Sequence, residues 1–187
     1  MQLLQPVQPI LTALPAAPVD GQVIMFQPAA GLVQHLRYNA ATSSWVTVGG
    51  KSAYSYSAYR NGAHNGGNAG IGYVNLFCDT VVYDPGGCQS PTQLGYVCKV
   101  AGRYLVAGQC RYTTSSGFSA VSVFKNAAMF REGALTAAGA SGFITAIVNA
   151  VVNDVLAIYV YHGAAGSALN AFSAGDNWMQ VELLDYA

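Results

Sequence analysis

Charged side chains are scarce in this chain: Asp, Glu, Lys and Arg make up 9% of its 187 residues, and the formal net charge is zero. An average soluble domain has about 25% charged residues. The few Lys and Arg residues are scattered and form no basic face, which excludes a nucleic-acid binder. Hydrophobic residues reach 52%, the reverse of a disordered composition. We therefore expect contacts between subunits to bury much of this apolar surface.

Membrane-spanning and secretion signals are also missing. The most apolar stretch, residues 143–161, is interrupted by Thr145, Asn149, Asn153 and Asp154. A spanning helix needs about 20 mostly apolar residues, so no membrane insertion is expected. The first residues, MQLLQPVQPILTALPAAP, have no basic start and contain Gln and Pro, unlike a signal peptide.

The cysteines follow no metal-binding pattern. Cys78, Cys88, Cys98 and Cys110 lie ten, ten and twelve residues apart, with no C-x-x-C motif. We therefore expect no metal site and no cofactor. Four cysteines allow three disulfide pairings, and the sequence does not choose among them. In the absence of a secretion signal, buried thiols acting as small apolar side chains are favoured over a structural disulfide.

Catalytic motifs are absent as well. The three histidines, at positions 35, 64 and 162, belong to no G-x-S-x-G or H-E-x-x-H pattern. Asp20, Asp84 and Asp154 each lie in an expected turn, where a carboxylate usually bonds to its own backbone. Nothing in the sequence brings Asp176 and Glu182 together as a glycosidase pair, and no dense Asp/Asn loop suggests calcium. The sequence predicts that this protein is not an enzyme.

What the chain does contain is strand-forming sequence, with 12 Tyr, 7 Phe and 21 Gly, and no helical period of any length. Apolar runs recur at the spacing of a β-sandwich. The expected strands are residues 54–59, 73–77, 80–83, 96–100, 103–113, 119–125, 128–131, 143–152, 155–161 and 178–184. This pattern predicts an all-β sandwich, jelly-roll or barrel, with the jelly-roll ranked first.

Alternation along residues 103–113 places Tyr104, Val106, Gly108 and Cys110 on one face. By contrast, residues 155–161 have no polar face, so this strand needs apolar cover on both sides. A second subunit is the simplest cover, and a closed trimer of sandwiches would supply it. The residues predicted for the trimer interface or core are Phe143, Ile147, Val155, Ala157, Tyr159, Tyr161 and Tyr104.

Residues 1–50 are predicted to form an N-terminal arm and a small β-module, followed by a head domain of residues 51–187. Four prolines precede three expected strands at 22–26, 33–38 and 45–48. Such a meander has almost no core of its own and needs a neighbouring surface. We interpret it as an attachment module, with Met25, Phe26, Leu36, Tyr38 and Trp45 as its contact residues.

Three loops are the candidate ligand-binding surface: residues 61–72, 112–118 and 163–177, which are rich in Gly, Ser and Asn. This composition suits carbohydrate or protein contact, although ordinary solvent-exposed turns have the same composition. The candidate loop residues are Asn65, Tyr112, Ser116, Asn170 and Asn177.

The stretch YVCKVAGRYLV, residues 96–106, resembles the signature of complement C1q and tumour-necrosis-factor-like jelly-roll domains: aromatic, x, x, Pro, x, x, Gly, x, Tyr. Tyr96, Gly102 and Tyr104 match, and Lys99 replaces the proline. The segments SAYR (57–60), VVYDPGG (81–87), VSVFKN (121–126) and VNDV (152–155) follow in the family's order. The resemblance covers about residues 52–186 and implies a trimeric jelly-roll that binds ligands or receptors through its loops, without catalysis.

Residues 14–22, 35–39 and 45–50 resemble a small β-module of bacteriophage fibre and appendage proteins. Together the two resemblances imply a homotrimeric knob on the virion surface, a capsid decoration or head fibre that residues 1–50 attach to other virion proteins. The alternative is a tail-fibre adhesin that recognises glycans or proteins of the host surface.

Overall fold

The computed structural model describes residues 9–29, 32–48, 54–60, 72–92, 95–111, 118–137, 140–163 and 176–186. Over these ranges the chain forms strands and turns, with no helix that could cross a membrane. The all-β prediction is confirmed. The strands are β1 (Ile10–Leu11), β2 (Val23–Ala29), β3 (Leu32–Asn39), β4 (Ser44–Thr47), β5 (Tyr56–Tyr59), β6 (Gly72–Asn75), β7 (Thr80–Tyr83), β8 (Tyr96–Val97), β9 (Gly102–Arg111), β10 (Phe118–Lys125), β11 (Ala128–Glu132), β12 (Thr136–Ala137), β13 (Ser141–Ala150), β14 (Val155–His162) and β15 (Trp178–Tyr186).

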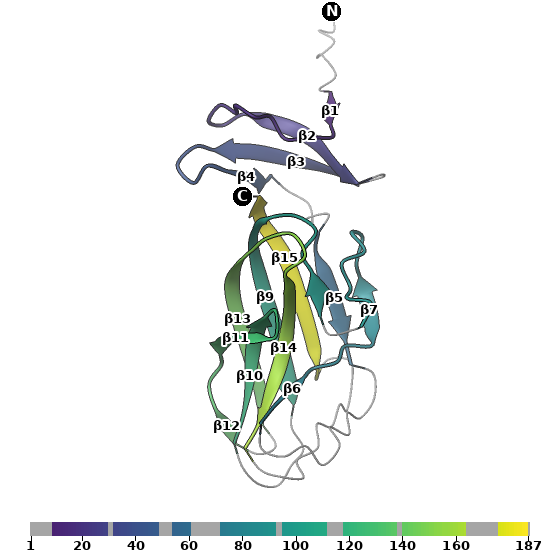
Figure 1. Cartoon of the computed structure of the whole chain (residues 1–187), viewed down its shortest axis with the longest axis vertical. Coiled ribbons are helices and arrows are strands. Elements are labelled where there is room, and N and C mark those ends of the chain that lie inside the picture. The colour runs from purple at the N-terminus through teal and green to yellow at the C-terminus, as the bar shows by residue number, and fades with distance from the viewer. Residues whose placement is uncertain are drawn as a thin grey trace, which may run out of the picture.

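Two sheets pack face to face to form a head, and strands β1 to β4 lie across one end of it (Figure 1). The first head sheet has the order β7-β5-β15-β9-β13. The second has the order β6-β14-β10-β11, with β8 beside β14 and β12 beside β10. Every strand pair within the head is antiparallel, as the hairpin-rich sequence predicts.

The core of the head lies between these sheets. Burial alternates along β9, and Tyr104, Val106 and Cys110 are completely buried, so the face predicted from the sequence points inward. Gly108 belongs to the same face. A Cβ atom on Gly108 would lie 2.6 Å from Cγ1 of Ile158 on the opposite sheet, closer than any side chain tolerates. The absence of a side chain at this position lets the two sheets approach each other.

Strand β14 is covered completely on its core side and only in part on the other. Leu156, Ile158 and Val160 face the core and are fully buried. On the outer side, Ala157 lies beside Phe124 of β10 and is only 4% exposed. Val155, Tyr159 and Tyr161 on this side are half-buried, so the second subunit expected to cover the strand stays a prediction.

The N-terminal strands continue the first head sheet. Strand β4 pairs with the last residues of β15, in the register Val46–Asp185 and Trp45–Tyr186. The neighbouring surface that this small meander was expected to need is thus the end of its own head. The predicted boundary at residues 50 and 51 lies outside the described residues and stays a prediction.

Two turns that are far apart in the sequence meet at Asp154. Its carboxylate accepts hydrogen bonds from Val151 N at 2.9 Å and from Asn126 Nδ2 at 2.6 Å, and Lys125 Nζ lies 2.9 Å away. Asn126 Oδ1 in turn accepts from Val155 N at 2.8 Å. These bonds fix the β10–β11 turn against the β13–β14 turn and join two of the segments that resemble the C1q family.

Candidate functional site

The predicted interface residues lie on three different surfaces. Phe143 and Ile147 of β13 are 54% and 53% exposed on the outer face of the first sheet. Tyr104 is completely buried between the sheets. The remaining four lie on the other side of the head, along the outer face of β14: Val155, Ala157, Tyr159 and Tyr161. Tyr104 therefore belongs to the core, whereas the other six residues lie on two opposite outer faces, where Phe143 and Ile147 are the ones most exposed on the first sheet.

The outer face of the first sheet combines an apolar edge with a groove. Strand β13 is the edge, ten residues long and without a charged residue. The ring of its Phe143 packs against Trp178 of β15, with 5.9 Å between the centroids. Next to it, a groove of about 360 Å³ is lined by residues of β5, β7, β9 and β15, including Tyr83, Leu105 and Glu182. Long uncharged edges of this kind are normally covered in soluble proteins.

The outer face of the second sheet carries a cluster of aromatic rings, which we call the aromatic face: Tyr73, Phe124, Tyr159 and Tyr161. The Phe124 ring stacks on Tyr159 with 4.0 Å between centroids, and Tyr73 lies 5.1 Å from Tyr161. The Tyr73 hydroxyl donates to Glu132 Oε1 at 2.6 Å, and this bond is the main reason why the pKa of Tyr73 rises to about 12. Sequence reasoning missed this cluster, because its four residues come from three separate strands, β6, β10 and β14.

The predicted attachment residues are largely buried inside the chain. Phe26, Leu36 and Trp45 are 7%, 0% and 4% exposed, and they face the head. Tyr38 packs on Trp45 at a centroid distance of 5.4 Å, and Met25 is half-buried on the opposite face. The attachment prediction therefore needs correction: these apolar rings form a joint between the N-terminal strands and the head, and three of the five residues are closed to a partner.

The opposite face of the N-terminal strands is the exposed one. Val23, Val33 and Val48 are 41%, 43% and 47% exposed. The register pairs Val23 with Arg37 across β2 and β3, so exposed Arg37 belongs to this face, as does exposed His35 opposite Met25. A partner would meet this face rather than the buried aromatic residues.

Most of the predicted loop residues cannot be placed. Asn65, Tyr112, Ser116 and Asn170 lie outside the described residues. Asn177 is only 1% exposed: its Oδ1 accepts the Arg111 N–H at 3.1 Å and its carbonyl accepts the Arg60 N–H at 2.9 Å. Asn177 was wrongly predicted as a ligand contact, because it ties the ends of three strands together.

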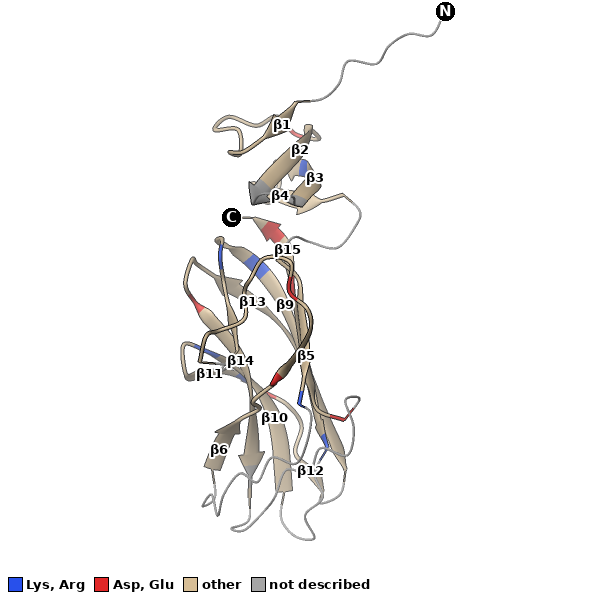
Figure 2. Ribbon diagram, turned by 90° about the vertical axis from the view of Figure 1, so that its right-hand side faces the viewer, with Lys and Arg blue, Asp and Glu red and all other residues tan. Residues whose placement is uncertain are grey.

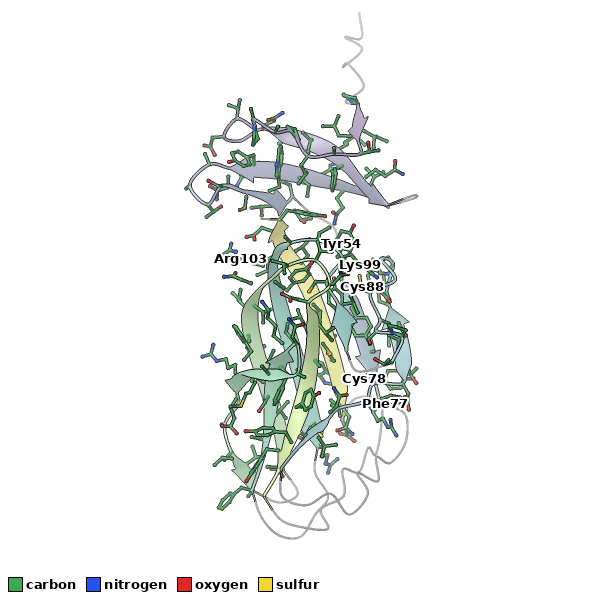
Figure 3. The ribbon with its side chains drawn as sticks, in the orientation of Figure 1. Tyr54, Phe77, Cys78, Cys88, Lys99 and Arg103 are labelled. Atoms are coloured by element: carbon green, nitrogen blue, oxygen red, sulfur yellow. The ribbon has the colours of Figure 1, made fainter. Side chains whose placement is uncertain are left out.

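The four cysteines are free thiols, and all four are buried, as the buried-thiol interpretation predicts. Figure 3 shows Cys88 near Lys99 at the end of the head that meets the N-terminal strands, whereas Cys78 lies towards the other end. Burial raises the pKa of the Cys78 and Cys98 thiols to about 12, and that of Cys88 to about 11. These thiols therefore stay protonated near neutral pH, where the thiolate is the nucleophilic form.

Asp154 and Arg103 in the described part of the head form hydrogen bonds and ion pairs with neighbouring groups of the same chain. Burial would raise the pKa of Asp154, but its hydrogen bonds from Val151 and Asn126 and the Lys125 ammonium lower that pKa to about 2. The Arg103 guanidinium donates to the Asp185 carboxylate where β9 meets β15. Charges are sparse over the described ribbon in Figure 2. Among the described residues, no group of three or more His, Cys, Asp and Glu could hold a metal ion.

The arrangement of the two sheets is shared with solved structures. Murine APRIL aligns with a TM-score of 0.53 at 11% identity, over 70% of this chain and 98% of its own. The globular domain of zebrafish complement 1qA protein and Eiger TNF from S. frugiperda both give 0.50, at 13% and 18% identity. Each covers 72% of this chain, and 98% and 94% of its own length respectively.

The head is a TNF/C1q-type jelly-roll. This confirms the fold that residues 96–106 suggested. The identities are low enough that the likeness extends to the fold alone. Neither a protein-family model nor a curated protein sequence matches the chain.

Proposed function

We propose that this protein is a non-enzymatic structural protein of a bacteriophage particle, a trimeric knob that its N-terminal strands anchor to the capsid surface. The observation that carries the proposal is the polarity of the molecule. The N-terminal strands lie across one end of the jelly-roll, and the long strands β9 and β14 run from there towards the opposite end (Figure 1). One end is thus suited to attachment and the other to display. The similarity of residues 14–50 to a module of phage fibre proteins supports the virion role.

Trimerisation is supported by the two complementary features of the first sheet. The uncharged β13 edge, with Phe143 and Ile147, would meet the groove of the next copy, which is lined by Leu105 and Glu182 among others. A contact between two different surfaces of one chain generates a ring when the rotation closes. The resemblance to C1q and TNF-like domains implies that three copies close it.

The corrected attachment surface is the exposed face that carries Val23, Val33, His35 and Arg37. This face lies on the side of the N-terminal strands away from the aromatic joint, so another virion protein could contact it without opening the chain's own core.

Light scattering on the purified chain tests the trimer, with three times 19.5 kDa as the expected mass. Phe143→Glu and Ile147→Glu should dissociate it, since each places a charge in an apolar contact. Val152→Glu is the matched control, because Val152 is similarly exposed at 51% but lies in the turn after β13. A monomeric native protein would contradict the trimer.

Immunogold labelling of particles with an antibody against the head tests the location. Gold on the capsid is expected, and gold confined to the tail would overturn the capsid assignment. The second candidate, a tail-fibre protein that binds host glycans or proteins, would then be favoured. The specific observation behind that candidate is the aromatic face, a surface that anchoring and trimerisation leave unused.

A further inference from the structure

The aromatic face is built from residues that share one side of the second sheet. The β-ladder places Tyr73 opposite Tyr161, and Tyr159 opposite Ser122 on β10. Tyr73 is 37% exposed, and Tyr159 and Tyr161 are half-buried, so their rings remain accessible above the sheet. Phe124, at 7% exposure, supports them from below through its stacking on Tyr159.

Polar groups at this face point to a ligand with hydroxyl groups. Glu132 is exposed, and one oxygen of its carboxylate already accepts the Tyr73 hydroxyl, which leaves further lone pairs free to accept. Ser122 points to the same side as Tyr159, is completely buried, and its Oγ has no hydrogen-bond partner within the described structure. A buried hydroxyl without a partner is uncommon in native proteins and calls for an explanation.

We propose that the aromatic face binds a neutral hexopyranose of a glycan, with one C–H face of the sugar stacked on the exposed Tyr73 ring and its hydroxyls donating to Glu132. A pyranose ring has an apolar C–H face and a rim of hydroxyls. This matches tyrosine rings, which are flat and apolar with a polar tip, beside a carboxylate acceptor.

Other occupants fit this surface less well. Two copies of the face meeting across a twofold axis would bring Glu132 against Glu132, a like-charge contact. The same carboxylate would repel the phosphates of a nucleic acid. An entirely apolar partner would leave the Glu132 carboxylate and the tyrosine hydroxyls desolvated without partners, which is costly. Since trimerisation is assigned to the other sheet, the aromatic face stays open in the assembled protein.

Saturation-transfer NMR on the full chain tests the proposal, with the methyl glycosides of galactose, glucose, mannose and N-acetylglucosamine as probes. At least one glycoside should receive saturation, strongest at the C–H protons of one ring face. Tyr73→Ala should weaken its binding about tenfold, as for truncation of a central contact residue. Glu132→Gln should weaken it by a smaller factor, since the amide is a poorer acceptor.

Two variants guard against loss of folding. Tyr73→Phe keeps the ring and should retain most of the binding. Tyr59→Ala removes a tyrosine ring from the opposite sheet, away from the groove, and should leave glycoside binding unchanged. Absence of saturation transfer for all four glycosides would overturn the proposal, and so would binding that Tyr73→Ala and Glu132→Gln leave intact. The inference rests on the second candidate function and makes it more specific. Light scattering on the same sample distinguishes failure of the glycan site from failure of the proposed trimer. A sample that is trimeric but binds no glycoside refutes this inference and leaves the trimer proposal standing.

Discussion

Tyr186 joins the N-terminal strands to the head, and its replacement tests whether the two fold as one unit. The side chain is 3% exposed at the end of β15. Its ring makes an edge contact with Phe26, at 5.8 Å between centroids, and another with Tyr54, at 6.4 Å. Its hydroxyl donates to Oε1 of buried Gln34. One residue thus contacts β2, β3 and the segment that leads into β5.

Two substitutions separate the ring from the hydroxyl. Tyr186→Phe keeps the packing but takes one partner from a buried amide, which costs about 1–2 kcal/mol of the free energy of unfolding. Tyr186→Ala also opens a cavity between the N-terminal strands and the head, and truncation of a buried aromatic ring costs about 3–5 kcal/mol. A chain of this size loses about 2–4 °C in Tm per kcal/mol. We therefore expect Tm to fall by about 2–8 °C for Tyr186→Phe and by about 6–20 °C for Tyr186→Ala.

Differential scanning calorimetry is the assay, because it counts transitions as well as measuring Tm. We expect one transition that shifts as a whole, since β4 pairs directly with β15. Tyr59→Phe, at a half-buried tyrosine in the other half of the head, is the control and should change Tm by much less. If Tyr186→Ala instead splits the curve, and only a small early transition moves, the N-terminal strands fold independently and the reasoning fails.

Three further outcomes follow from the structure. Gly108→Ala should lower the free energy of unfolding in urea by about 1–3 kcal/mol, because the new Cβ would meet Ile158. In a chain that already carries Ile158→Ala, the same change should cost less, and equal costs in the two backgrounds would contradict the contact. Asp154 has a folded-state pKa of about 2, below its usual value of about 3.9, so its stabilisation is complete above about pH 4 and is lost as pH falls through 2. Asp154→Asn should be less stable at neutral pH and show a shallower decline of stability in acid unfolding experiments. All four thiols should resist Ellman's reagent at pH 8 until the protein is unfolded, and fast reaction of the native chain would contradict their burial.

The sequence was sufficient to predict the long strands and the fold, because strict alternation identifies which residues share a face. Residues 143–152 alternate clearly, and β13 occupies 141–150. The strand expected at 96–100 is shorter in the structure, where β8 ends at Val97 and the Cys98 N–H bonds to the Asp154 carbonyl at the β13–β14 turn. Strands β1 and β12 have two residues each, too few to produce a periodic pattern.

The candidate sites were predicted less well, because alternation does not say what each face meets. Phe26 and Trp45 are apolar residues at the correct spacing for a contact surface, yet the surface they contact is the end of their own head. The partial cover of β14 by its own sheet was missed for a similar reason. Phe124 lies 33 positions before Ala157, and only the pairing of β10 with β14 brings the two side by side.

The pairing of β4 with β15 also determines how a force applied at the N-terminal strands would reach the head. Tyr186 pairs with Trp45 of β4 on one side of β15 and with Gly102 of β9 on the other. A Cβ atom on Gly102 would lie 2.1 Å from the Asp185 carbonyl oxygen, so the absence of a side chain at Gly102 lets β9 and β15 pack closely where the N-terminal strands are attached. The N-terminal strands are therefore joined to the centre of the first sheet and not to an edge strand. A partner bound to the exposed face of Val23 and Val33 would hold the head through β15 and then β9, the strand next to the proposed trimer edge on β13. In the proposed assembly, anchoring and trimer contacts would then act on one continuous sheet, and the aromatic face on the other sheet would stay free for recognition.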